Sequence, residues 1–474
     1  MKTQWTTWLL SLTIAVCVST FAGSAARAAD AANRLVVHEW GTFTALQNEK
    51  GQELTGVNID DEPVPDFVHN LHPFILGSPI VSSQHWRYRQ KGAPSHHPLV
   101  TVRLETPVIY FHPPQGMKLP RTLDVSVQFR GGWLTEFYPN AEATAPGLDQ
   151  GTFRFGKLTP ETVGGLDWRN VQIGTDGVGP QTDEHVWLAP RDVEAANVTT
   201  PEGESERYLF YRGVGNLRAP LRVTTDRDMD QLSIYANFDE VLSATQSVTI
   251  PALWLADIRA DGSSAYRRLG PVEVTADLDK QLAQVSSAFQ ADDYACKKLV
   301  ELQAEMHKQL VASGLNGDEA TALLSTWQRA YFTSPGLRLF FLVPEEWTNH
   351  YLPLSISVDA EVSRVMVGRI ELISDEQRAL LDRLAQTSPS DPGWIVDIPQ
   401  SEAKEQFLTG HSNFGELGVQ IPADYQMYLA LGRFRNALVT AQERATPTEN
   451  LTRFINNYSL HSFRWDASGD ENEK

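Results

Sequence analysis

Short segments of alternating apolar and polar residues fill residues 29–277 of the 474-residue chain. In Leu123–Phe129 every second side chain is apolar, and the residues between them are polar or charged. A period of two residues is typical of an antiparallel strand with one buried face. Glycine, proline, asparagine and aspartate separate these segments, and we find no helical period between them. This part of the chain therefore predicts a β-rich domain with an antiparallel, β-sandwich-like core.

Helical periodicity replaces this pattern in residues 278–335, where we expect a helical hairpin. The first helix carries apolar side chains three or four residues apart, namely Leu299, Leu302, Met306 and Leu310. A second helix is expected to begin at Asn316 or Asp318 and to end before the Pro335-Gly336 pair. The hairpin would place one apolar stripe against the rest of the protein.

Strand-like and helical segments alternate in residues 336–465. The polar tail, residues 466–474, is expected to be disordered. Ser374 followed by Gln377 has the spacing of a capping box at a helix start. The returning strands can extend the first sheet or form a second α/β unit, and the sequence leaves both arrangements open. The predicted fold class is α+β and β-rich, with a helical hairpin and C-terminal helices on a sandwich-like core.

The first 28 residues have the features of a secretory signal peptide. Lys2 precedes an apolar segment, Leu9–Val18, and Ala26-Arg27-Ala28 fits the small residues required at a cleavage site. We therefore expect a mature chain that begins at Ala29 and is exported to the periplasm or the extracellular space; an uncleaved anchor is the alternative. No later apolar run reaches the roughly 18 residues of a membrane-spanning helix, so no transmembrane segment is expected after cleavage.

Composition and motifs argue against several protein classes. A formal net charge of −19 repels phosphate backbones, which makes nucleic acid an unfavourable partner. The sequence contains no Cys-x-x-Cys-His, Walker A or dinucleotide motif, so neither covalent haem nor a nucleotide cofactor is expected. The absence of a Gly-x-Ser-x-Gly motif disfavours a serine hydrolase of the nucleophile-elbow type. Signal cleavage leaves Cys296 as the single cysteine, and we expect it to be a small buried side chain rather than a nucleophile.

Histidines are concentrated early in the mature chain. Seven fall between residues 38 and 112, namely His38, His69, His72, His85, His96, His97 and His112. Several carboxylates lie among them, and imidazole combined with carboxylate suits Zn, Mn or Fe. The candidate ligands of such a divalent metal are His38, His69, His72 and His112. The candidate general bases, which would activate a metal-bound water, are Glu39 and Asp61.

The strand Leu35–Ala45 (LVVHEWGTFTA) places the neighbours His38 and Glu39 on opposite faces. Gly41 inside a strand indicates a bulge or a close backbone approach, and a bulge would turn Glu39 toward the histidines. Without that change Glu39 is buried and needs a cationic partner, for which Arg103 is one candidate. The structural alternative to catalysis is an ion pair between Glu39 or Glu105 and one of three arginines, Arg103, Arg130 or Arg212.

Tryptophans are frequent in the β-rich part, and exposed indole faces stack on sugar rings. We expect most of these tryptophans to pack in the core, and we regard glycan binding by an exposed indole as the less favoured alternative. The acidic run Asn58–Phe67 lacks the spacing of an EF-hand, so a solvated loop is expected in preference to a calcium site.

The segments HEWGTFT, RLETPVIYFH and LFYRGVG resemble a group of uncharacterised exported bacterial proteins. The later segments SPGLRLFFLVPEEWTNHYLPLSI and RVMVGRIELI resemble the same group, so the resemblance covers most of the mature chain. It implies export from a bacterial cell, and it assigns no activity and no site residue.

Two functions from different classes follow. The first is a metal-dependent hydrolase with a His/carboxylate site in residues 38–112. The alternative is a non-enzymatic binding or envelope-assembly protein, which would dock a partner on an aromatic sheet face or on the helical hairpin. The partner in either case would be a small molecule, a glycan or an envelope component.

Overall fold

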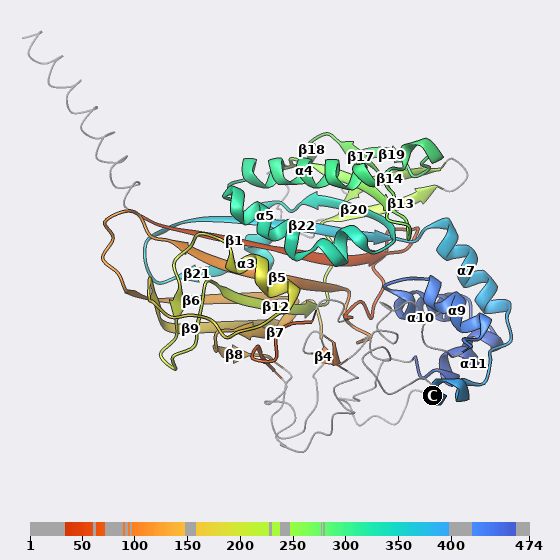
Figure 1. Ribbon diagram of the computed structural model, residues 1–474. Helices are drawn as coiled ribbons and strands as arrows, with labels where there is room; N and C mark the ends of the chain where they lie inside the picture. The colour runs from red at the N-terminus through yellow and green to blue at the C-terminus, as the bar shows by residue number, and fades with distance from the viewer. Residues whose placement is uncertain are drawn as a thin grey trace, which may run out of the picture.

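The computed structural model has an α+β, strand-rich architecture, which confirms the expected fold class (Figure 1). It describes residues 34–59, 63–71, 89–90, 93–94, 97–146, 158–226, 230–237, 247–275, 277, 280–397 and 420–460. The expected signal peptide, the C-terminal tail and two candidate site residues, Asp61 and His72, lie outside the described residues.

One large, mostly antiparallel sheet of 15 strands forms the centre of the molecule. Its main path runs in the order β11 (Ser205–Glu206), β10 (Val198–Thr199), β9 (Val163–Ile173), β7 (Gly132–Tyr138), β12 (Leu209–Gly215), β5 (Val102–His112), β1 (Leu35–Gln47), β22 (Ala360–Leu372), β20 (Gly336–Leu342), β16 (Leu253–Ile258) and β17 (Ser264–Leu269). Four strands pair beside this path: β2 (His69–Asn70), β6 (Arg121–Arg130), β8 (Glu142–Thr144) and β21 (Leu354–Ile356).

Smaller sheets accompany the large one. One has three strands, β13 (Leu221–Asp226), β14 (Gln231–Ala236) and β19 (Gln281–Ser286). Two have two strands each: β15 (Val248–Ile250) with β18 (Val272–Val274), and β3 (Arg89–Gln90) with β4 (Ala93–Pro94). Strand β19 occupies part of the range in which we expected the first helix of the hairpin.

The strands that return after the helical hairpin join the first sheet. Strand β22 pairs in parallel with β1 along its whole length, from Leu35 opposite Ala360 to Gln47 opposite Leu372. Strand β20 pairs with β22 on its other side and with β16 beyond. Of the two arrangements that the sequence left open, the structure therefore shows the extended first sheet.

Strand β1 separates two hydrophobic cores because its side chains alternate between its faces. Val37 and Phe43 belong to one core, which also contains the apolar face of β6. That face carries the alternating side chains expected from the sequence, Leu123, Val125, Val127 and Phe129, all of them buried. Trp40 points the other way, into a core shared with the hairpin helices. We call this second side of β1 the helix face.

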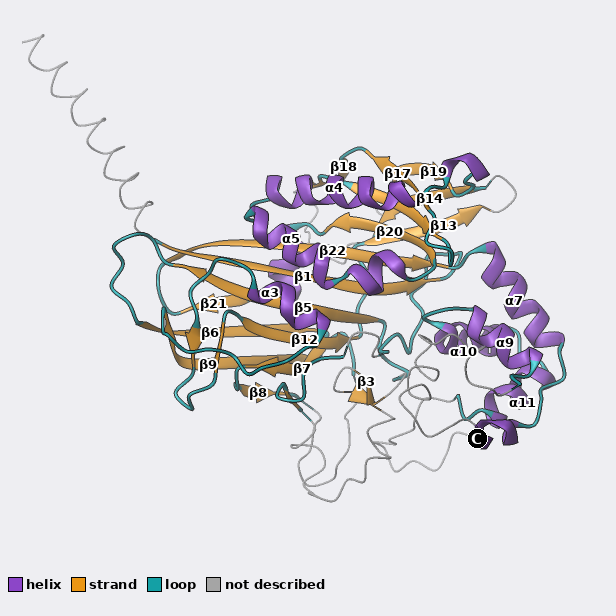
Figure 2. Ribbon diagram, viewed as in Figure 1, coloured by secondary structure: helices purple, strands orange, loops and turns teal. Residues whose placement is uncertain are grey.

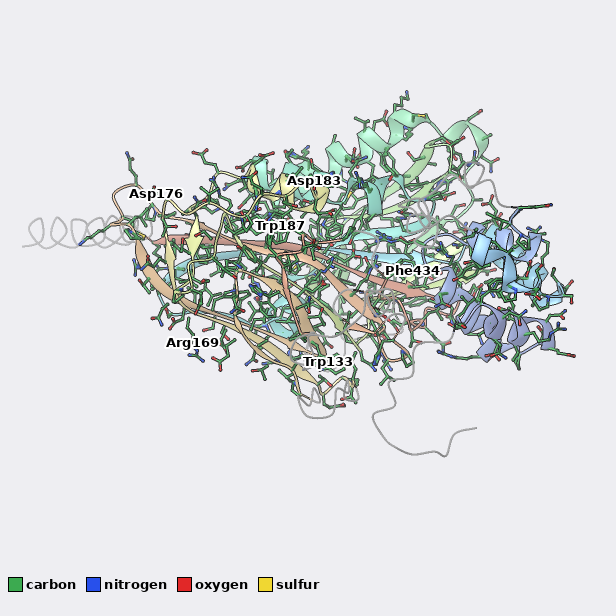
Figure 3. The ribbon with its side chains drawn as sticks, turned by 60° about the horizontal axis from the view of Figure 1, so that its bottom comes forward. Trp133, Arg169, Asp176, Asp183, Trp187 and Phe434 are labelled. Carbon is green, nitrogen blue, oxygen red and sulfur yellow. The ribbon has the colours of Figure 1, made fainter. Side chains whose placement is uncertain are left out.

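Helices cover the helix face of the sheet (Figure 1). They are α3 (His185–Arg191), α4 (Cys296–Ala312), α5 (Gly317–Thr326) and the short π-helical segment η3 (Gln328–Thr333). Trp187 of α3 is fully buried in this layer (Figure 3). The apolar stripe expected on the first hairpin helix is present, since Leu302, Met306 and Leu310 are buried. Cys296, at the start of α4, is exposed, so the expectation of a buried cysteine is wrong.

Further helices lie mostly toward the C-terminus, and several gather at one end of the sheet (Figure 2). They are α6 (Glu345–Tyr351), α7 (Asp375–Gln386), α9 (Ala423–Ala430), α10 (Arg435–Ala445) and α11 (Glu449–Asn457), with short 3-10 turns η2 (Ala291–Asp293) and η4 (Pro392–Asp397). The predicted capping box at Ser374 is present, because Gln377 N–H donates to its hydroxyl and the Gln377 side chain accepts from its backbone. In the part of the chain that the structure describes, every helix is too short or too polar to cross a bilayer.

Candidate metal centre

Two of the predicted histidines meet on the helix face. His38 of β1 lies opposite Tyr110 of β5, and Val36 lies opposite His112. His112 is therefore the diagonal neighbour of His38 on the same side of the antiparallel pair. The two imidazole ring centroids are 4.9 Å apart.

A carboxylate from the helical hairpin joins the two rings. His38 Nδ1 lies 2.7 Å from Glu319 Oε2, and His112 Nε2 lies 3.0 Å from Glu319 Oε1. The possible ligand atoms of these residues all lie within 4.8 Å of one another. Among the described residues, this is the one group of three or more His, Cys, Asp or Glu side chains close enough to share a metal ion.

Helix α5 fixes the position of Glu319. The helix begins after Asn316, whose backbone N–H donates to Glu319 Oε2 at 2.7 Å and so closes one side of a capping box. A carboxylate in the first helical turn is also favoured by the positive end of the helix dipole. The Glu319 side chain is fully buried, whereas that of His38 is 9% exposed and that of His112 is 18% exposed. The site therefore lies under α5, with His112 on its more open side.

The buried carboxylate of Glu319 is ionised at neutral pH. Burial by itself raises its pKa, but the hydrogen bonds from His112 and His38 outweigh burial and hold the pKa at about 2. Each hydrogen bond requires the imidazole nitrogen that faces Glu319 to carry its proton. A cation could replace these two protons, because metal binding releases protons from its ligands.

The donor set fits a divalent transition metal, and the spacing requires a small adjustment. Two ligand atoms that are each about 2.0–2.2 Å from a tetrahedral zinc lie roughly 3.4 Å apart. The nitrogen–oxygen separations of 2.7 and 3.0 Å are those of direct hydrogen bonds. Metal entry would therefore widen the separation at His38 by about 0.7 Å and that at His112 by about 0.4 Å.

The other candidate ligand that the structure describes lies elsewhere. His69 is in β2, and its Nε2 lies 2.8 and 2.9 Å from the two oxygens of Glu204. Both side chains are about one-third exposed. The structure does not bring His69 together with His38 and His112.

Glu39, a candidate general base, points away from the histidines into the opposite core. It accepts a hydrogen bond from Tyr211 Oη at 2.5 Å and pairs with the guanidinium of Arg364. Gly41 lies at a register shift between β1 and β5, and an added Cβ there would lie 2.9 Å from Pro107 Cα. The expected irregularity is therefore present, but it leaves Glu39 on the face that strict alternation predicts.

The alternative to catalysis was an ion pair between Glu39 or Glu105 and one of three arginines, and the structure shows it for Glu105 only. Glu105 pairs with Arg103, whose Nε lies 2.5 Å from its Oε1, and both side chains are fully buried. Glu39, by contrast, has Arg364 rather than Arg103 as its partner. Arg212 pairs with Glu136 instead.

Sequence reasoning missed Glu319 as a member of the site. It lies 281 residues from His38 along the chain, in a segment that we assigned to a helical hairpin. The one local signal is its place three residues after Asn316, which indicates a helix cap and carries no information about histidines.

Comparison with known proteins yields little similarity. No protein-family model matches the chain, and no curated protein matches its sequence. The Fcho1 mu homology domain of Danio rerio, with a bound Eps15 peptide, matches at a TM-score of 0.28 and 8% identity, covering 72% of this chain and 99% of that chain. The yeast delta-COP-I mu-homology domain, in complex with a Dsl1 WxWxV peptide, matches at 0.22 and 10% identity, covering 72% and 96%. At these TM-scores the likenesses carry no argument about fold, function or partner.

Proposed function

We propose that this is an exported binding protein that holds a divalent cation between His38, His112 and Glu319. The observation that carries the proposal is the convergence of two imidazoles on one ionised, buried carboxylate. Export is supported by the signal-like N-terminus, with its apolar segment and small residues at the cleavage position.

The ligand types favour a transition metal. Two nitrogens and one carboxylate oxygen suit Zn, Fe or Mn, whereas calcium and magnesium prefer sites built from oxygen alone. Three protein ligands also leave a coordination position for water or for a donor atom of a partner. The more open side of the site, at His112, is where such a donor would enter.

The cation would also join the helical hairpin to the sheet. Glu319 comes from α5, whereas His38 and His112 come from β1 and β5. Metal binding would therefore stabilise the docking of α5 on the helix face, since a ligand that binds only the folded state adds to its stability. The partner of the assembled surface would be a small molecule, a glycan or an envelope component.

A metal-dependent hydrolase is the second candidate. The open coordination position favours it, because catalytic zinc sites keep one position for water. It requires a base that accepts a proton from that water. Glu39 does not meet this requirement, since it lies in the opposite core and is bonded to Tyr211 and Arg364. A binding function needs no such base and is therefore our first choice.

Calorimetric titration of zinc and manganese into the metal-stripped mature protein tests the cation site. We expect His112→Ala to weaken zinc binding at least about 100-fold, because it removes a ligand and the proton partner of Glu319. His69→Ala is the matched control and should bind zinc as the wild type does. Equal zinc affinity in wild type and His112→Ala, or no binding by the wild type, would refute the proposal.

Hydrolysis assays on the zinc-loaded protein separate the two candidates. Nitrophenyl esters and nitrophenyl phosphates cover the acyl and phosphoryl classes of substrate. The binding function predicts that neither is hydrolysed above the rate of free zinc, although zinc is bound. Hydrolysis that His112→Ala abolishes and His69→Ala leaves intact would establish the enzyme instead.

A further inference from the structure

A second buried polar group lies on the helix face, toward the other end of β1. Arg338 of β20 and Arg369 of β22 both contact Glu371, with Nε atoms 3.3 and 2.5 Å from its Oε1. Both guanidinium groups are essentially unexposed. We call these three residues, together with Tyr331, the arginine cluster.

Both arginines donate hydrogen bonds to backbone carbonyls. The acceptors lie in η3 and in Ser334, the residue that follows it. Arg369 Nη1 donates to Ala330 O at 3.0 Å, and Arg338 donates to Tyr331 O and Ser334 O at 2.8 Å each. The Arg369 guanidinium also lies 4.3 Å from the ring centroid of Tyr331. These contacts orient both arginines, but carbonyls and rings carry no full negative charge.

The charges in the cluster are unequal. Arg338 and Arg369 share one carboxylate, Glu371, and burial lowers the pKa of Arg338 to about 10. Asp257 acts on Arg338 from farther away, and its carboxylate already accepts a hydrogen bond from Tyr294 at 2.5 Å. A further cation, Arg433, donates to the same Ala330 carbonyl at 2.9 Å, but it has its own carboxylate neighbour, since its Nη2 lies 3.5 Å from Glu105 Oε1. The excess of positive charge is therefore that of Arg338 and Arg369, which share Glu371 and are both fully buried.

Two buried donors of the cluster, Arg338 Nε and Arg369 Nη2, have no hydrogen-bond acceptor among the described residues. Both side chains are fully buried, and Arg338 Nε lies at ion-pair distance, 3.3 Å, from Glu371 Oε1. Leaving a charged donor unpaired in the interior costs several kcal/mol, so native proteins satisfy such groups with a side chain, a water or an ion. The excess of positive charge favours an anion over a neutral water at this position.

We propose that Arg369 Nη2 binds a small monovalent inorganic anion of the halide class, which is chloride under extracellular conditions. The anion neutralises the charge that Arg338 and Arg369 leave after sharing Glu371. A halide fits better than a multivalent oxyanion, because the excess is about one positive charge and the rings of Tyr331 and Phe340, stacked at 5.7 Å, offer a larger anion no hydrogen-bond donors. This site does not depend on the metal centre.

Bromide replaces chloride chemically and is visible by its anomalous scattering. Crystals of the mature protein grown in sodium bromide should show an anomalous peak in hydrogen-bond distance of Arg369 Nη2. An exposed arginine such as Arg169, whose side chain is 63% exposed, should show none and serves as the internal control. Water, or a carboxylate of the chain itself, at the Arg369 position would overturn the proposal.

Thermal unfolding in solution provides a second test. At constant ionic strength, replacing gluconate by chloride should raise the unfolding midpoint of the wild type, and the rise should saturate. Arg369→Met should lose this rise, whereas Arg378→Gln, which alters an arginine bound to Glu49 elsewhere, should keep it. Identical midpoints in the two salts for the wild type would overturn the proposal, even if Arg369→Met fails to fold.

Discussion

The helix face carries two buried polar groups that differ in chemistry. At one, two histidines share the carboxylate of Glu319, and one ring is partly exposed. At the other, two arginines share the carboxylate of Glu371, and both are closed to solvent. Histidine loses its proton near neutral pH, but arginine does not. On our proposals, a metal cation replaces protons at the first group, whereas the second group, whose two arginines share one carboxylate, takes up an anion.

The α5–η3 segment covers both groups. Glu319 lies in the first turn of α5, and Ala330 and Tyr331 lie in η3, which follows directly after Trp327. The same stretch of chain therefore contributes a carboxylate to the histidines and carbonyl oxygens to the arginines. The segment therefore contacts a buried charged group at each of its ends.

Glu105→Gln should have the largest effect on stability. Glu105 accepts hydrogen bonds from Thr44 and Tyr331 and pairs with Arg103, all of them buried. Loss of its charge leaves a buried guanidinium without its carboxylate, which costs about 3–5 kcal/mol of unfolding free energy. Urea unfolding at neutral pH measures the loss. A loss below about 1 kcal/mol would mean that this pair behaves like an exposed one.

Glu39→Gln separates a structural role from a catalytic one. We expect a destabilisation of about 3 kcal/mol, because Arg364 loses its buried partner. Zinc affinity should stay within about twofold of the wild type, since Glu39 faces the opposite core. Zinc titration and urea unfolding on the same samples provide both values. A large loss of zinc affinity without destabilisation would place Glu39 in the metal site after all.

Glu319 should make the stability of the metal-free protein depend on pH. Its pKa is lowered from 4.5 to about 2, so its contribution is fully present above about pH 4.5 and is lost as pH falls through about 2. With chelator present, the wild type should exceed Glu319→Gln by about 3 kcal/mol near neutral pH, and by much less near pH 2. Unfolding free energies across this range measure the difference. A constant difference would contradict the lowered pKa.

Arg169→Gln should have the smallest effect. Arg169, which is labelled in Figure 3, pairs with Glu142. The two side chains are 63% and 71% exposed. Such a pair contributes less than about 0.5 kcal/mol, because water screens it and both side chains lose freedom. The variant therefore serves as the exposed reference for the two buried pairs. A loss comparable to that of Glu105→Gln would remove the distinction between buried and exposed pairs.

Local features of the sequence predicted much of the fold and two of the three side chains of the site, His38 and His112. Alternation in β1 placed His38 and Trp40 on one face and Glu39 on the other, and Gly41 indicated the irregularity beside them. These predictions succeeded because a strand fixes side-chain direction over a few residues.

Long-range partners could not be predicted in the same way. Glu319 reaches His38 across 281 residues and Arg364 reaches Glu39 across 325, and their pairing depends on how the hairpin and β22 return to β1. The sequence analysis offered Arg103 as one candidate partner for Glu39. In the structure Arg103 lies opposite Thr44, on the helix face, where it pairs with Glu105.

Anomalous diffraction at the zinc edge, from crystals of the mature protein soaked in zinc, tests the central claim most directly. We predict one strong peak about 2.0–2.2 Å from nitrogens of His38 and His112 and an oxygen of Glu319. The contradicting result is a map without a peak at this position, with both imidazoles still hydrogen-bonded directly to Glu319.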